Sequence, residues 1–472
     1  MRQRKTLWGI ALPLLLNMLI SQVQLVIDRS FLGKLDVNYM SALGNVSAPF
    51  WTTMSVIWAL TTGATVLMSQ AIGAGKEDRV AGLGHSVLKF NTLVSLLVMV
   101  MWFFLADGIF KAMGVTGVVL DHALVYLRLL LPMVLLTGPL SGGVSILQAY
   151  GATRPVLISG IVRSGLNVVL DWVLIFGRFG APAMGIRGAA LATSIAEAVG
   201  TVVLFAVLLR PGTIPIRLSW REILESPLSL YGKVTKKGLP SAGEELLWNL
   251  GNLGIMRLLN SISMTAAGIF TMIFSIDILP ALVFISMGQA VLTLTGHRTG
   301  EGDARGAVRV GLRGLRDSWI MATAMFLVFV LAPRFLLGIF TTDQAVIDRS
   351  VPYLIIAGIV FYPRSVNIIL GHGIRGYGDT KWMMKTQIFG TVYIVACAAF
   401  LLFVMDLGIL SVYIALLSDE TIRAVINTVR FLKGPGDSAA APAELDESPQ
   451  EETLRTAEAL ASGGPVNADV QH

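Results

Sequence analysis

The chain has 472 residues, of which 54% are hydrophobic and 14% charged, and its formal net charge is +6. A soluble domain has nearer a quarter of its residues charged, so this composition excludes a soluble globule and indicates a polytopic membrane protein. A single cysteine, Cys397, excludes an internal disulfide, and together with five scattered histidines it leads us to expect no metal site and no cofactor. No patch of basic and aromatic residues indicates nucleic-acid binding.

Twelve transmembrane helices are predicted, because a helix needs about 20 apolar residues to cross a bilayer. The first follows Arg2, Arg4 and Lys5, but it is too long for a signal-peptide core and is interpreted as a retained helix. The last is the most polar, since Asp419 and Glu420 lie within it. The predicted spans are 7–30, 45–69, 86–106, 120–147, 155–176, 186–209, 238–260, 266–291, 314–340, 347–372, 381–405 and 408–431.

Lysine and arginine gather in the connections that follow even-numbered spans, most densely between 210 and 237 and between 298 and 313. The positive-inside rule then places both termini in the cytoplasm of a multi-pass protein, which we expect in a bacterial inner membrane. The segment 434–472 lacks apolar periodicity and is rich in Ala, Pro, Glu and Asp, so it is predicted to be a disordered acidic tail.

Three motifs recur at one constant spacing, which indicates an internal repeat. The differences 240−13, 300−73 and 377−150 are each 227, for the pairs Pro13/Pro240, Gly73/Gly300 and Tyr150/Tyr377. The chain is therefore predicted to be two six-helix lobes, 1–209 and 238–433, joined by a cytoplasmic linker, 210–237. Six helices per repeat give both lobes the same orientation, an arrangement typical of transporters with a site between the halves. The glycines that close the repeated turns are expected to adopt positive φ.

One predicted span carries polar groups that are expensive in lipid. Asn167 and Asp171 are four residues apart and so lie on one face of a helix, where an ionised carboxylate costs about 2.5 to 3.5 kcal/mol at the membrane centre. A cavity, an ion, a proton or a basic partner such as Arg163 would offset that cost.

No Gly-Lys pair continues into a Walker A motif, and no constellation of catalytic residues is present, so neither an ATPase nor a membrane enzyme is indicated.

Several sequence motifs in combination resemble those of the multidrug and toxic compound extrusion (MATE) family, and the resemblance extends over about residues 5 to 432. The resemblance rests on Asp28-Arg-Ser-Phe-Leu-Gly33, Gln70-Ala-Ile-Gly-Ala-Gly75, Tyr150-Gly-Ala-Thr-Arg-Pro155, Asn167 to Gly177 and Gly185 to Thr193. It implies a V-shaped pair of lobes that exports organic, often cationic, compounds in exchange for protons or sodium ions, and we expect a monomer.

The resemblance further implies a coupling site formed by Asp28, Asn167 and Asp171. Two carboxylates in one low-dielectric pocket favour proton uptake, whereas carboxylate and amide oxygens also suit a sodium ion, so both ions stay open. An ion pair of Asp28 with Arg29, or of Asp171 with Arg163, is the structural alternative.

A second set of polar residues could bind cargo or form a second coupling site. It consists of Asn17, Gln22, Glu244, Glu245 and Asp277. Cargo would also contact aromatic surface, for which Phe50, Trp51, Trp58, Trp248 and Phe284 are candidates.

Three arginines within spans, Arg163, Arg257 and Arg364, either neutralise the carboxylates or, if unpaired, favour anionic cargo. Anionic cargo leads to the alternative function, a flippase for a lipid-linked precursor or oligosaccharide.

Overall fold

The structure is a computed structural model that describes residues 6–435, so nearly all of the predicted acidic tail lies outside the described residues. Within 6–435 the regular structure is helical apart from one isolated bridge between Pro211 and Ile214. The helices are α1 (Leu7–Gly33), α2 (Val37–Gly73), α3 (Glu77–Ala112), α4 (Gly117–Ala149), α5 (Arg154–Phe176), α6 (Ile186–Leu208), α7 (Trp220–Glu225), α8 (Leu228–Ile262), α9 (Met264–Gly300), α10 (Ala304–Leu331), α11 (Pro333–Gly338), α12 (Gln344–Gly376), α13 (Thr380–Phe403) and α14 (Leu410–Leu432).

All twelve predicted spans are present as helices of at least 23 residues, and two short helices, α7 and α11, lie between them. Ten of the long helices in the described part of the chain are apolar enough to cross a membrane by composition alone, and α8 and α14 are not among them. The predicted span 314–340 is wrong at its end. Helix α10 stops at Leu331, because Pro333 cannot donate the hydrogen bond that would continue the helix and instead begins α11.

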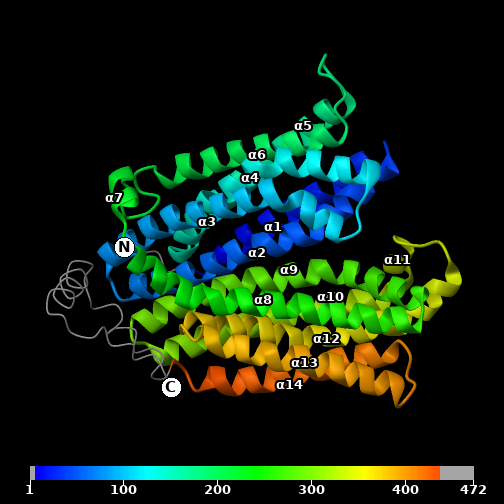
Figure 1. Ribbon diagram of the computed structural model, residues 1–472. Coiled ribbons are helices and arrows are strands. Elements are labelled where there is room, and N and C mark those ends of the chain that lie inside the picture. The colour runs from blue at the N-terminus through cyan, green and yellow to red at the C-terminus, as the bar shows by residue number, and fades with distance from the viewer. Residues whose placement is uncertain (1–5, 436–472) are drawn as a thin grey trace, which may run out of the picture.

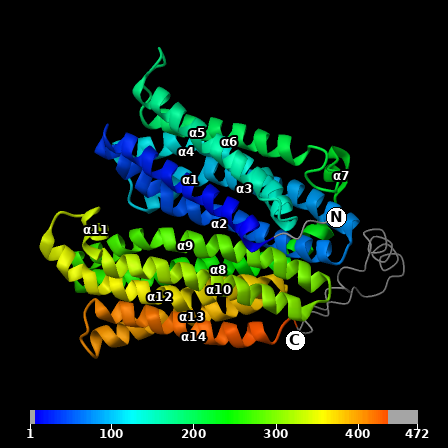
Figure 2. The same ribbon diagram turned by 180° about the vertical axis from the view of Figure 1, so that it is seen from behind.

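The helices form two lobes, the N-lobe (α1–α6) and the C-lobe (α8–α14). In the N-lobe α5 packs against α1 and α6, and α4 packs against α2, α3 and α6; in the C-lobe α12 packs against α9, α10 and α14. Figure 1 shows both described ends of the chain on one side of the molecule, here called the terminal end, while the lobes diverge toward the opposite, far end. The view from behind in Figure 2 agrees.

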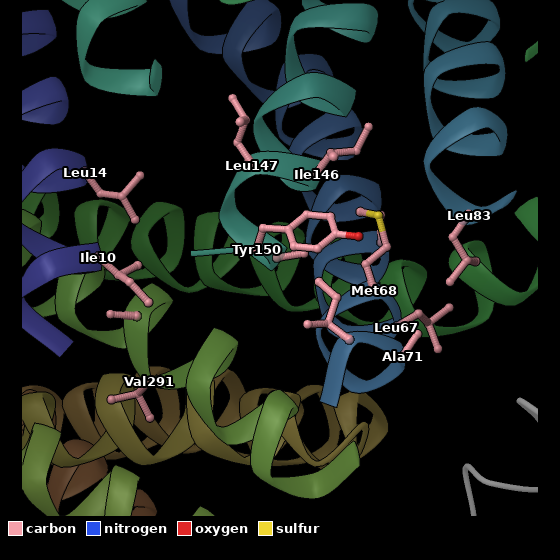
Figure 3. Close-up of a cluster of buried hydrophobic side chains, with 14 of the residues drawn as sticks. Ile10, Leu14, Leu67, Met68, Ala71, Leu83, Ile146, Leu147, Tyr150 and Val291 are labelled. Carbon is pink, nitrogen blue, oxygen red and sulfur yellow. The ribbon is translucent and has the colours of Figure 1, made fainter. Parts of the chain in front are cut away.

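The buried side chains explain why the lobes meet at one end only. One apolar cluster contains residues of both lobes, including Ile10, Met68, Tyr150 and Val291, and the other two clusters each lie within a single lobe. In Figure 3 Val291 of the C-lobe lies beside the N-lobe side chains of the shared cluster. Burial of this shared apolar surface stabilises the contact between the lobes.

The turns that follow the repeated motifs adopt the predicted conformation. Gly75 and Gly302 have φ of 73° and 74°, and Gly151 and Gly378 have φ of 63° and 90°. Each pair is 227 residues apart, so the repeat seen in the sequence is also a repeat of backbone geometry. Gly73 and Gly300 do not need positive φ, since both lie within helices.

Candidate functional site

The structure brings Asp28, Asn167 and Asp171 together inside the N-lobe. Asp28 projects from α1 and the other two from α5, and these helices pack against each other. Asn167 and Asp171 are fully buried, while Asp28 is half-buried. The carboxyl groups of Asp28 and Asp171 lie within hydrogen-bonding reach of each other, and Gln24 bonds to Asp28. The spacing of four residues on α5 therefore does place both side chains on the face that meets α1.

The Asn167 amide bridges the two carboxyl groups. With its nitrogen toward them, it donates to Asp28 Oδ1 over 3.0 Å and to Asp171 Oδ2 over 3.3 Å. Its oxygen then accepts hydrogen bonds from the Thr193 backbone nitrogen at 3.2 Å and hydroxyl at 3.3 Å, on α6. The site is thus held by three helices, and Asn167 fixes the separation of the carboxyls.

Within the described residues, no guanidinium forms a salt bridge with this carboxyl pair. Arg29, the residue after Asp28, is exposed, and its positive charge acts on the Asp28 carboxyl without a salt bridge between them. Arg163 turns away from Asp171 and bonds to Glu197 Oε2 of α6 at 3.3 Å and to Ser21 Oγ at 3.2 Å. Oδ1 of Asp171 is buried without a hydrogen-bond donor. A buried charge without a salt-bridge partner is costly, and a proton or another cation bound to the pair would offset that cost.

The same positions in the C-lobe are apolar. Adding 227 to 28, 167 and 171 gives Ile255, Ile394 and Ala398, and Ile255 and Ala398 are 2% and 0% exposed within one hydrophobic cluster. The carboxyl pair is therefore a feature of one lobe and not of the repeated architecture.

The C-lobe has a different polar interior, in which carboxylates are paired with arginines. Glu244 Oε1 of α8 accepts a hydrogen bond from Arg375 of α12 at 2.5 Å. Asp277 of α9 and Glu420 of α14 both bind Arg364 of α12, the latter over 3.3 Å. Arg364 thereby ties three helices of the lobe together.

The sequence did not identify the contribution of α14 to this interior. Arg423 binds Asp419 over 2.7 Å and the side-chain oxygen of Gln387, on α13, over 3.0 Å, and Asn367 donates to Glu420 over 2.6 Å. The only available signal was the spacing of four residues between Asp419 and Arg423, which allows an ion pair along one helix face. This pairing, with that of Arg430 and Asp379, explains how a helix with four charged residues can pack within the lobe.

The remaining predicted residues are dispersed. Asn17 Oδ1 is buried against Gly160 of α5, so Asn17 and its repeat counterpart Glu244 both point into their lobes. Glu245 is exposed, and the Gln22 side chain makes no hydrogen bond to the described residues. The candidate aromatics divide in two. Phe50 and Phe284 are buried core residues, whereas Trp51 and Trp58 of α2 are exposed and stack with ring centroids 5.7 Å apart.

A known family model matches each half of the chain separately. The MatE family model matches twice, over residues 13–173 and 240–401, and the two matches begin 227 residues apart (240−13). The probable multidrug resistance protein NorM of Thermotoga maritima is 26% identical, over 93% of this chain and 94% of that protein. The multidrug resistance protein NorM of Vibrio cholerae is 23% identical, over 83% and 85%.

Solved structures agree on the fold. An outward-facing conformation of a multidrug resistance MATE family transporter of the MOP superfamily superposes with a TM-score of 0.84 at 18% identity, over 93% of this chain and 96% of the other. The family match covers more than half of the chain in two copies, as the internal repeat requires. The chain belongs to the MATE (MatE) family, a family of multi-pass membrane transporters rather than enzymes.

Proposed function

We propose that the chain is a secondary active multidrug efflux transporter that exchanges organic, cationic or amphipathic compounds for H⁺ or Na⁺ by alternating access. The observation that carries the proposal is the Asp28–Asn167–Asp171 cluster, which has two carboxyls, no salt bridge to an arginine among the described residues, and no counterpart in the C-lobe. The names of the NorM relatives support multidrug resistance as the role.

The cluster suits ion coupling because its charge state changes how α1 contacts α5. Two ionised carboxylates held within hydrogen-bonding reach repel each other in a buried site, and one added proton converts that repulsion into a shared hydrogen bond. A sodium ion between the carboxylate and amide oxygens would have the same effect. The bound cation therefore favours packing of α1 on α5, and its release favours separation.

The cargo surface is proposed to be aromatic and weakly acidic. Trp51 and Trp58 lie on α2 and Trp248 on α8, the helices through which the two lobes contact each other, and all three are exposed. Glu245 is exposed on α8, as Leu246 and Trp248 are. Stacking and cation–π contacts tolerate many organic cations, which suits a polyspecific exporter.

Anionic cargo, as in the flippase alternative, would need unpaired arginines near the cavity. Arg163 and Arg364 are each bound to carboxylates, and Arg257 is exposed near the far end of α8. This pairing favours the efflux function over the flippase.

From the distribution of lysine and arginine, we propose that the terminal end faces the cytoplasm and that the chain lies in a bacterial inner membrane. We further propose that it acts as a monomer.

The proposal is tested by flux in proteoliposomes, first with a proton gradient and then with a sodium gradient. We expect one gradient to drive uptake of a fluorescent organic cation, and Asp171→Asn to reduce that flux to the level of empty vesicles, because the amide cannot release a proton and carries no charge for sodium. Asp406→Asn is the matched control, since Asp406 is an exposed turn residue with φ of 52° that Asn tolerates. Wild-type flux by Asp171→Asn would overturn the coupling assignment.

A further inference from the structure

Two glycines at the terminal end bring the backbones of the lobes into direct contact. A Cβ atom on Gly73 of α2 would lie 2.0 Å from the carbonyl oxygen of His297 of α9, and a Cβ on Gly300 of α9 would lie 2.0 Å from the carbonyl oxygen of Gln70 of α2. Real Cβ contacts are never this close, so each position admits glycine only. The two contacts are reciprocal, because 300−73 and 297−70 are both 227.

Gln70 and His297, whose backbones contact these glycines, form a reciprocal pair of hydrogen bonds through their side chains. Gln70 Nε2 donates to the carbonyl oxygen of Gly376 at the end of α12, over 2.9 Å. His297 Nε2 lies 2.7 Å from the carbonyl oxygen of Ala149 at the end of α4, where its N–H donates. The acceptors are also repeat mates, since 376−149 is 227. Each lobe therefore contributes one side chain that binds the last carbonyl of a helix in the other lobe.

The bond of Gln70 is buried, the bond of His297 is partly buried, and neighbouring bonds reinforce both. Gln70 is 1% exposed, and Ala149 and Gly376 are buried. Beside them Thr293 donates to the carbonyl oxygen of Gln148 over 3.3 Å, again between lobes, and within the C-lobe Lys237 donates to that of Gly378 over 3.1 Å. The hydrogen bonds between lobes that join α2, α4, α9 and α12 thus gather where the chain's described ends lie (Figure 1).

We propose that Gln70, Gly73, His297 and Gly300 form an interlobe latch that holds the terminal end closed and must be broken for that end to open. The latch rests on the proposed function only in assigning the opening to a transport cycle. Its physical basis is independent of any ion: glycine contacts let the helices cross closely, and the close crossing brings each side chain to a helix-end carbonyl. Gln70 and His297 are positioning residues that set the balance between the two states.

Distance measurements between spin labels test the latch directly. A Cys397→Ser background carries cysteine pairs at Asp78 and Arg305, exposed repeat mates at the terminal end, or at Val37 and Met264, which are 77% and 90% exposed at the far end. In the unaltered chain we expect a single short distance for the 78/305 pair. Gln70→Ala and His297→Ala should each raise the ratio of open to closed terminal end by roughly threefold to tenfold, the effect of losing one intramolecular hydrogen bond.

The glycine variants should have a larger effect. Gly73→Ala or Gly300→Ala should abolish the short 78/305 distance, because the added methyl group cannot fit in the closed state, and should shorten the 37/264 distance. Gly44→Ala and Gly268→Ala are the matched controls on the same helices, α2 and α9, because a Cβ at either position meets nothing within 4 Å. His297→Gln should restore the closed population lost in His297→Ala, because Gln70 already makes the equivalent bond.

The outcomes separate the latch from the proposed function. If Gly73→Ala leaves the 78/305 distance unchanged in a folded, monodisperse protein, the latch is overturned; the same holds if His297→Gln and His297→Ala behave alike. If the distances shift as expected while no organic cation is transported, the latch stands and the proposed cargo is wrong.

Discussion

At the scale of single residues, Arg364 is the side chain whose loss should cost the C-lobe most. It is bound to Asp277 and Glu420, so Arg364→Met leaves the buried Asp277 carboxylate without a cation and leaves Glu420 with Arg423 alone, at 3.6 Å. Breaking a buried ion pair by removing one partner costs about 3 to 5 kcal/mol. We expect a clearly lower thermal unfolding midpoint in detergent. Arg257→Met, at an exposed position of α8, is the control, and equal midpoints for both variants would contradict the assigned contacts.

The sequence predicted the N-lobe cluster but not the ion pairs. Asn167 and Asp171 stand out because polar residues are rare in an apolar run, and their spacing fixes their common face. Glu197, the partner of Arg163, lies 34 positions further along the chain, and Glu420 lies 56 positions beyond Arg364. Which helix faces which is decided by packing of the whole lobe, so no local pattern reveals these partners.

At the scale of helices, the contact between α5 and α6 should control the geometry of the coupling cluster. A Cβ on Gly188 of α6 would lie 2.6 Å from the carbonyl carbon of Leu174 of α5. Gly188→Ala should therefore push α5 outward, separate Asn167 from Thr193, and lower both thermal stability and ion-driven flux. Gly165→Ala on α5 meets nothing within 4 Å and should change neither by much, since alanine is the better helix former. Wild-type flux in Gly188→Ala would show that the cluster does not depend on this contact.

Helix positions were read from the sequence more accurately than helix ends. Apolar length locates each span, but α2, α3 and α9 extend beyond the predicted runs, and part of the added turns is buried, as Ile72 of α2 and Val80 of α3 are in the shared cluster. Positive φ at Gly75 and Gly302 was predictable from the turn motif. The role of Gly73 and Gly300 was not, since close approach of two helices depends on the partner helix.

At the scale of the whole molecule, the repeat predicts that repeat mates lie on the same side of the membrane. In the Cys397→Ser background, single cysteines at positions 78 and 305 should both be protected from a membrane-impermeant maleimide in intact cells, and cysteines at 37 and 264 should both react. Permeabilised cells provide the control, because all four positions are exposed and should then react. Labelling of one member of a pair but not the other would contradict the parallel arrangement of lobes.

The number of carboxyl groups in the N-lobe cluster sets an upper limit on the stoichiometry of the proposed exchange. Asp28 and Asp171 can together release at most two protons, or bind the charge of at most two monovalent ions, in each cycle. Exchange of two protons for one monovalent organic cation moves one net charge across the membrane, which is worth about 2.3 kcal/mol per 100 mV. Export of a monocation would then respond to membrane voltage as well as to pH, whereas a one-for-one exchange would be electrically silent.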